Sequence, residues 1–192
     1  MRYKNDHAPV FDAGMVTSAT IPEGTSSGTY LGIFKATDYD IGSQSTVTYS
    51  LSPDLGYLSI NNNNGTLTVS GTLDRELTPQ IKVDVVATDN APPEFQKSTK
   101  HSFVLVVSDL NDNAPQFDFN NTLTKPYHYV RETVKIGEVA MVATATDLDE
   151  GENARMVYAL VSRNDSGMFE FDRISAHFTV KGTKKIILLI LS

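Results

Sequence analysis

The sequence predicts an all-β fold made of two tandem Greek-key β-sandwiches with seven short strands each, the second of them incomplete. Three observations predict this fold: an internal repeat of domain length, apolar residues that alternate with polar ones, and turn residues between the alternating segments. With 192 residues, 40% of them hydrophobic, the chain can form two globular domains of roughly 100 residues each. The repeat outweighs local predictions because it fixes the domain organisation.

The repeat is clearest at two proline-containing segments, residues 5–11 (NDHAPVF) and 111–117 (NDNAPQF), whose prolines lie 106 residues apart. Further copies keep a spacing of 109, since residues 36–40 (ATDYD) return as residues 145–149 (ATDLD). The second copy follows the first as far as Thr183 and then diverges. The chain therefore repeats a unit of domain size.

Apolar residues in the first repeat alternate with the period of β-strands, in which successive side chains point to opposite faces. Asparagine-, glycine- and proline-rich segments at residues 61–65 (NNNNG) and 90–93 (NAPP) separate these runs and predict turns. Such a pattern is typical of a Greek-key sandwich. We expect Phe11 and Phe117 to anchor the two cores. The alternating residues are Val47, Tyr49 and Leu51; Leu67 and Val69; Ile81, Val83 and Val85; and Phe103, Leu105 and Val107.

The repeat predicts four segments. Residues 1–8 end a linker from a preceding repeat, residues 9–111 form one repeat, residues 112–116 form a second linker, and residues 117–192 form a truncated repeat. From about residue 184 the tail has no counterpart in the first repeat, and we expect it to be foreign to the fold and the second repeat to be unstable alone.

Composition excludes several classes of function. A net charge of −7 without a basic stripe argues against nucleic-acid binding. The absence of cysteine excludes disulfides, zinc–thiolate clusters and thiol nucleophiles. The histidines are dispersed and no nucleophile motif is present, so we expect neither an enzyme nor a small-molecule substrate. No signal peptide or membrane-spanning run is visible.

The repeated proline-containing segments carry ligands for a hard cation. In each, an amide, a carboxylate and a backbone carbonyl follow one another, and the proline favours an extended conformation in the residue before it. Oxygen atoms of these kinds are the ligands that Ca²⁺ prefers. The sequence therefore predicts calcium binding at the junction between the repeats.

Four acidic motifs occur in a fixed order: Glu23, residues 73–76 (LDRE), residues 109–115 (DLNDNAP) and residues 147–149 (DLD). Together they resemble the calcium motifs of extracellular cadherin repeats, which have an immunoglobulin-like sandwich fold. The resemblance covers nearly the whole chain. Residues 149–153 (DEGEN) are more similar to repeats of the protocadherin, Fat and Dachsous type than to those of classical cadherins.

The resemblance implies a set of calcium ligands at the junction, six of them carboxylates whose mutual repulsion calcium would neutralise. Side chains would serve at most positions, and Leu110, Asn113 and Asn153 would offer backbone carbonyls. The implied ligands are Glu23, Asp74, Glu76, Leu110, Asn111, Asp112, Asn113, Asp147, Asp149 and Asn153.

A second set near the start of the chain resembles half of such a site, whose remaining ligands would come from a preceding repeat. Acidic doublets in turns are also common as solvated surface residues, and the repetition of the motifs favours the calcium interpretation. At position 7 a histidine replaces asparagine, and the family binds there through the backbone. The half-site residues are Asn5, Asp6, His7, Asp38, Asp40, Gln44 and Asp89.

The resemblance implies calcium-dependent cell–cell adhesion on the extracellular side of the plasma membrane, with a cadherin ectodomain on the facing cell as a homophilic partner. A structural spacer without a recognition role, in contact with neighbouring repeats only, is an alternative, and a truncated product without function is another. Three acceptor triplets, at Asn64, Asn120 and Asn164, permit glycosylation in a secretory setting.

Overall fold

The structure is a computed structural model that describes residues 4–117, 127–130, 133–159, 167–182 and 187–190. Among these residues, the regular elements are β-strands and one short 3₁₀ helix, η1 (Gly42–Ser45), so the all-β prediction is confirmed. No helix in the described ranges is long and apolar enough to cross a membrane. The chain divides into a first unit, Met1–Leu110, and a second unit, Asn111–Ser192.

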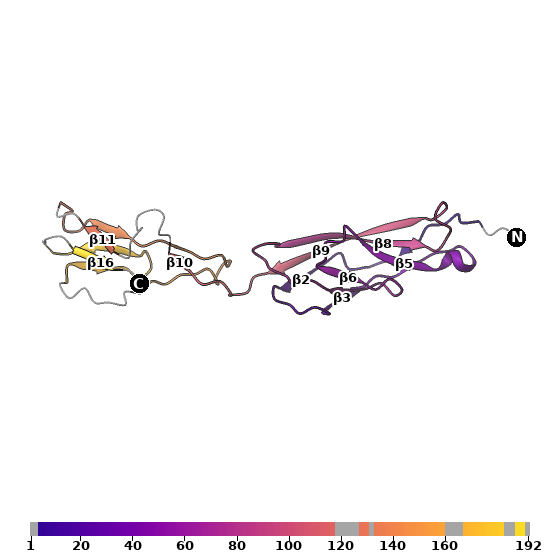
Figure 1. Cartoon of the computed structure of the whole chain (residues 1–192), viewed down its shortest axis with the longest axis horizontal. Coiled ribbons are helices and arrows are strands. Elements are labelled where there is room, and N and C mark those ends of the chain that lie inside the picture. Colours follow the sequence, from indigo (N-terminus) through magenta and orange to yellow (C-terminus); the bar gives the residue numbers. More distant parts are fainter. Residues whose placement is uncertain (1–3, 118–126, 131–132, 160–166, 183–186, 191–192) are drawn as a thin grey trace. The chain divides into compact units, whose positions relative to one another are not determined.

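The first unit is a sandwich of a four-stranded sheet, in the order β2-β9-β8-β5, and a three-stranded sheet, in the order β3-β7-β6 (Figure 1). A short pair, β1 with β4, accompanies the seven sandwich strands. Strand β2 runs parallel to β9, and the other pairs are antiparallel. The strands are β1 (Val10–Phe11), β2 (Ser18–Pro22), β3 (Tyr30–Ile33), β4 (Ala36–Thr37), β5 (Val47–Ser52), β6 (Leu58–Ile60), β7 (Thr66–Val69), β8 (Gln80–Asp89) and β9 (Ser98–Ser108).

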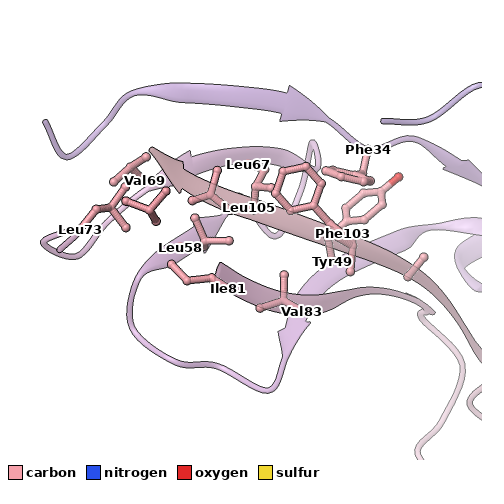
Figure 2. Close-up of a cluster of buried hydrophobic side chains, with 13 residues drawn as sticks. Phe34, Tyr49, Leu58, Leu67, Val69, Leu73, Ile81, Val83, Phe103 and Leu105 are labelled. Carbon is pink, nitrogen blue, oxygen red and sulfur yellow. The ribbon is translucent and has the colours of Figure 1, made fainter. Parts of the chain in front are cut away.

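The core of the first unit lies between its two sheets and includes residues from each predicted alternating run, together with Phe34, Leu58, Leu73 and Ala87, which the prediction did not include. Figure 2 shows Phe34, Tyr49 and Phe103 gathered at one end of this cluster and Val69 and Leu73 at the other. The rings of Phe34 and Phe103 meet edge to face, with centroids 5.9 Å apart, a favoured aromatic geometry. The period-two pattern therefore identified the buried faces of the strands.

The asparagine-rich turn joins β6 to β7, as the sequence predicts. The Asn61 side-chain oxygen accepts hydrogen bonds from the backbone N–H groups of Asn63 (3.0 Å) and Asn64 (3.1 Å). Gly65 has a φ of +69°, and a Cβ atom there would lie 1.9 Å from the carbonyl oxygen of Phe34. Glycine therefore avoids both the strain of a left-handed conformation and a clash with the Phe34 backbone.

The second unit repeats two of the strand arrangements of the first. Strand β10 pairs with β13 in the register of β1 with β4, and the β12-β15-β14 sheet repeats β3-β7-β6, including the irregularity in the β3–β7 pairing. The internal repeat is thus a repeat of topology. The strands are β10 (Gln116–Phe117), β11 (Tyr127–Val130), β12 (Val139–Val142), β13 (Ala145–Thr146), β14 (Phe169–Phe171), β15 (His177–Val180) and β16 (Ile187–Ile190).

The tail of the chain forms a strand. Strand β16 pairs antiparallel with β11, with Tyr127 opposite Ile190 and Val130 opposite Ile187. Strand β11 corresponds to β2 at the repeat spacing of 109, and β2 pairs in parallel with β9. The tail departs from the repeated sequence, as predicted, yet it pairs with the strand that corresponds to β2, which pairs with β9 in the first unit. The expectation of a tail foreign to the fold is therefore wrong in this respect.

The opposing layer of the second unit differs from that of the first. Residues 156–158, which correspond to the start of β5, are described without a strand, because β5 pairs with β8 and no counterpart of β8 lies among the described residues of the second unit. Phe117, expected to anchor the core, is 37% exposed, and its ring lies 6.3 Å from that of Tyr158. Phe11 packs against the first core as expected.

Candidate metal centre

The first group of predicted ligands gathers where β2 and β9 end. These strands run parallel, with Pro22 opposite Ser108, so the residues that follow each strand leave the sheet at the same edge. The backbone N–H of Glu23 donates to the carbonyl oxygen of Ser108 at 2.9 Å. The parallel register therefore places Glu23 beside Asp109 and Leu110.

The Glu23 carboxylate is a buried acceptor, since the residue is 4% exposed. Its Oε1 accepts a hydrogen bond from the backbone N–H of Leu110 at 2.9 Å, and its Oε2 accepts one from the backbone N–H of Arg75 at 2.8 Å. Hydrogen bonds to charged groups are among the stronger ones in proteins. Glu23 therefore ties the turn at residues 73–78 to the end of β9.

The turn after β7 supplies Asp74 and Glu76, the other predicted carboxylates of the first unit. Asp74 Oδ1 accepts from the backbone N–H of Leu77 at 2.9 Å, which leaves its second oxygen for another partner. Glu76 contacts the Arg75 guanidinium. Burial raises the pKa of Glu76, and Glu23 adds to this effect while Arg75 opposes it.

Asp109 belongs to the same group of carboxylates, although the sequence interpretation did not include it among the ligands. Its Oδ1 lies 2.5 Å from Arg75 Nε, and its side chain is 12% exposed. The signal was present in the sequence, because Asp109 begins the 109–115 motif. The ligand set carried over from the family did not use that position.

The second group of predicted ligands lies in the second unit, at the antiparallel pair β10–β13. Gln116 lies opposite Thr146, so the residues before β10 lie beside those after β13. The backbone N–H of Asn113 donates to Asp149 Oδ1 at 3.2 Å, and its side-chain Nδ2 donates to the same oxygen at 2.9 Å. The pairing thus brings residues 111–113 and 147–149 together.

Asp147 and Asp149 form a compact turn after β13. The backbone N–H of Asp149 donates to Asp147 Oδ1 at 3.0 Å, a local bond that aspartate favours in turns. Asp112 Oδ1 accepts from Asn113 Nδ2 at 2.9 Å. Asn111 is exposed, and the backbone N–H of Asn153 donates to the carbonyl oxygen of Glu150 at 3.2 Å.

The predicted half-site in the first unit has the same construction. Val10 lies opposite Thr37, which places residues 5–7 beside residues 38–40. The backbone N–H of Asp40 donates to Asp38 Oδ1 at 2.8 Å, and that of His7 donates to Asp40 Oδ2 at 3.2 Å. The two repeats therefore form the same hydrogen-bonded arrangement at equivalent positions.

His7 takes the position that Asn113 has in the second unit. Its Nδ1 lies 2.9 Å from Asp40 Oδ1 and 3.1 Å from Asp6 Oδ1. The hydrogen bond between His7 and Asp40 lowers the pKa of Asp40 and raises that of His7. Ligand atoms of these three side chains lie within 4.8 Å of one another, close enough to share one ion.

Asn5 and Asp89 complete the half-site, with Asp89 in a supporting position. Asp89 is 0% exposed, and its carboxylate accepts from the backbone N–H groups of Ala91 and Lys97, each at 3.1 Å. Asn5 Nδ2 donates to Asp89 Oδ2 at 2.9 Å. Asp89 therefore orients the amide, which leaves Asn5 Oδ1 as the oxygen that could face a cation.

Buried oxygen atoms without a hydrogen-bond partner test whether these residues fit a cation. Within the described part of the chain, Asn5 Oδ1, Asp38 Oδ2, Gln44 Oε1 and Asp149 Oδ2 are buried and accept no hydrogen bond. Such groups are rare in native proteins and call for a partner such as an ion. Each of the four belongs to a predicted ligand residue, and amide and carboxylate oxygens suit Ca²⁺. The donor set fits calcium.

One of the three glycosylation candidates lies among the described residues. Asn64 is exposed, and its Oδ1 accepts from the backbone N–H of Thr66 at 3.0 Å. Asn120 and Asn164 lie outside the described residues. Glycosylation at these positions stays a prediction.

Comparison with known proteins gives a consistent result. Residues 17–107 match the model of the cadherin domain family. Among curated relatives, mouse cadherin-23 is 34% identical over 179 residues, which is 93% of this chain and 5% of that protein. Human protocadherin-16 is 36% identical over 90% of this chain and 5% of that protein. The chain thus spans about one twentieth of the length of these relatives.

Solved structures agree with the sequence comparisons. The crystal structure of mouse cadherin-23 EC22-24 covers 95% of this chain with a TM-score of 0.82 and 29% identity, and the chain covers 56% of it. The protocadherin GammaB4 extracellular domain covers 95% of this chain with a TM-score of 0.74 and 25% identity, and the chain covers 30% of it. Both units therefore share their fold with extracellular repeats.

Proposed function

Because this chain belongs to the cadherin family, we propose that it is part of an adhesive ectodomain whose repeats Ca²⁺ stiffens at their junction. The buried, unpartnered oxygens of Asp149, and of Asn5, Asp38 and Gln44 in the equivalent half-site, carry this proposal. They are oxygen ligands held in place by the fold, and nothing among the described residues satisfies them.

The proposed ligands of the junction are divided between the two units. The first unit contributes Glu23, Asp74, Glu76 and the Leu110 carbonyl, and the second contributes residues 111–113, Asp147, Asp149 and the Asn153 carbonyl. Bound calcium would neutralise these carboxylates, which repel one another by about 4 kcal/mol per pair at 4 Å and an effective dielectric near 20. Calcium would therefore stiffen the linker, and its removal would loosen it.

Calorimetric titration of single variants tests this assignment. Asp112→Ala should weaken calcium binding more than Asp38→Ala, because Asp112 belongs to a junction with ligands from both units. Asp38 belongs to a half-site whose ligands, among the described residues, come from one unit. The matched control is Asp54→Asn, which changes an exposed carboxylate that accepts a single backbone bond from Gly56. A stronger effect of Asp38→Ala would mean that the junction is assigned to the wrong residues.

Adhesion and spacing are separable roles for the same repeats. We favour homophilic, calcium-dependent adhesion at the outer face of the plasma membrane, in keeping with the adhesive character of the family, and spacing without recognition is the alternative. Beads coated with this chain should aggregate in millimolar calcium and disperse in chelator if the repeats recognise one another. Beads that stay dispersed in calcium, while longer versions of the protein aggregate, would favour the spacer role.

A further inference from the structure

Arg75 lies among the carboxylates of the first unit. Its side chain is 14% exposed. Its Nε lies 2.5 Å from Asp109 Oδ1, and its Nη2 contacts Glu76 Oε1. Its backbone N–H donates to Glu23 Oε2 at 2.8 Å. A single arginine therefore reaches three of the carboxylates at this end of the unit.

The guanidinium is suited to this position. It presents several N–H donors in a planar fork that can bind two carboxylates at once. Arginine does not lose its proton in proteins under ordinary conditions. Arg75 therefore stays charged and offsets part of the repulsion among Glu23, Glu76 and Asp109.

We propose that Arg75 is an internal counter-ion that stabilises the calcium-free first unit and opposes calcium binding at Glu76. This inference rests on the proposed function, because Glu76 is one of the proposed calcium ligands. A positive charge in contact with a ligand carboxylate repels a second cation and occupies a carboxylate oxygen that the ion would use. Arg75 would thus keep the affinity for calcium lower than the carboxylates alone would give.

The proposal predicts effects of opposite sign from one substitution. Loss of the Arg75 charge should destabilise the protein in chelator, where the carboxylates then repel one another without compensation. The same loss should strengthen calcium binding. A merely structural role would instead make both properties worse, because a distorted site binds calcium poorly.

Isothermal titration calorimetry and thermal unfolding of the whole chain test the proposal, with Arg75→Gln, Arg75→Lys and the control Lys100→Gln. Lys100 is an exposed residue of the first unit that pairs with Asp84 at 3.4 Å, so its substitution removes one positive charge away from the proposed ligands. Arg75→Gln should lower the Kd for calcium about tenfold and reduce the Tm in chelator by several degrees.

Arg75→Lys should tighten binding by about threefold, because lysine keeps the charge but lacks the planar fork that holds two carboxylates. Lys100→Gln should leave the Kd within about twofold of the parent value. If Arg75→Gln does not fold in chelator, the comparison of Arg75→Lys with the parent protein decides the question.

Unchanged or weaker calcium binding in Arg75→Lys and in any folded Arg75→Gln protein would overturn the proposal. That outcome is distinct from a failure of the proposed function, in which the parent protein itself would show no saturable binding of calcium.

Discussion

Replacement of Glu23 by glutamine tests how the fold builds the first group of ligands. The substitution keeps the shape of the side chain and removes its charge. Each Glu23 carboxylate oxygen accepts one backbone hydrogen bond, from Leu110 at 2.9 Å and from Arg75 at 2.8 Å. Glutamine has a single side-chain oxygen, so one of these N–H groups would face an amide NH₂ group and lose its acceptor.

The cost follows from that lost bond. A hydrogen bond to a charged group contributes about 1.5 to 3 kcal/mol, and a buried donor without an acceptor adds a desolvation cost. We therefore expect Glu23→Gln to destabilise the first unit by about 2 kcal/mol or more in the absence of calcium. At roughly 4 to 8 °C per kcal/mol for a domain of this size, the Tm should fall by about 8 to 16 °C.

Calorimetric melting of the whole chain in chelator, together with amide hydrogen exchange, measures this effect at the residues concerned. The amides of Arg75 and Leu110 should lose protection first, because they donate to the altered side chain. The control, Asp54→Asn, changes an exposed carboxylate that accepts one backbone bond from Gly56 at 3.1 Å, and it should shift the Tm by a few degrees at most. A Glu23→Gln protein as stable as this control, with both amides still protected, would refute the proposed connection between the turn and β9.

Three further results are expected. Gly65→Ala should destabilise the first unit by about 3 kcal/mol or more in urea denaturation. The new Cβ would lie 1.9 Å from the Phe34 carbonyl oxygen, and a left-handed φ costs alanine about 1 to 2 kcal/mol by itself. A loss of stability below about 1 kcal/mol would contradict this close approach. The hydrogen bond from the Ser102 hydroxyl lowers the pKa of Asp84. The Asp84 carboxylate should therefore contribute to stability above the unfolded-state pKa of about 3.9, and this contribution should be lost as the pH falls through the lower folded-state pKa. Plots of stability against pH for the parent and for Asp84→Asn should converge in acid, and parallel plots would argue against a stabilising role of this hydrogen bond. Leu189→Pro should make the second unit more sensitive to limited proteolysis, because proline disrupts the β11–β16 pairing. An unchanged rate of cleavage would show that this pairing contributes little to the stability of the second unit.

The sequence predicted the elements whose signal is local. Alternation placed Tyr49, Leu67 and Phe103 in the core, where they are buried, because a strand with one face inward exposes the other to water. The repeated Asp-x-Asp turns were equally predictable, since the hydrogen bond from the Asp40 backbone N–H to the Asp38 side chain depends on neighbouring residues alone. Most of the first unit could therefore be predicted without coordinates.

What the sequence did not predict depends on pairing between distant residues. The strand at residues 187–190 forms against β11, a partner whose own apolar pattern is weak. Phe117 is exposed although Phe11 packs against a core, because the layer opposite it differs between the units. The contact of Arg75 with Asp109 joins residues 34 positions apart, and the motif around each gives no indication of the other.

The Ala176 backbone is a further example. Its φ is +52°, the left-handed region that glycine favours, and it stands where the first repeat has Gly65. The backbone N–H of Ala143 donates to the Ala176 carbonyl oxygen at 3.1 Å, as that of Phe34 donates to Gly65 at 2.9 Å. The repeated hydrogen bond therefore holds a conformation that alanine would not predict.

The most direct test of the central claim is the Tm of the parent protein in calcium, in magnesium at the same ionic strength, and in chelator. A ligand that binds only the folded state stabilises it by RT ln(1 + [L]/Kd), which is about 1.4 to 2.7 kcal/mol per site at roughly 10 to 100 times Kd. Since extracellular sites of this kind bind calcium at about 10⁻⁴ to 10⁻³ M, 10 mM calcium should raise the Tm by several degrees or more, and magnesium should raise it much less. Equal Tm values in calcium and in chelator would contradict the assignment of these oxygens to a calcium centre.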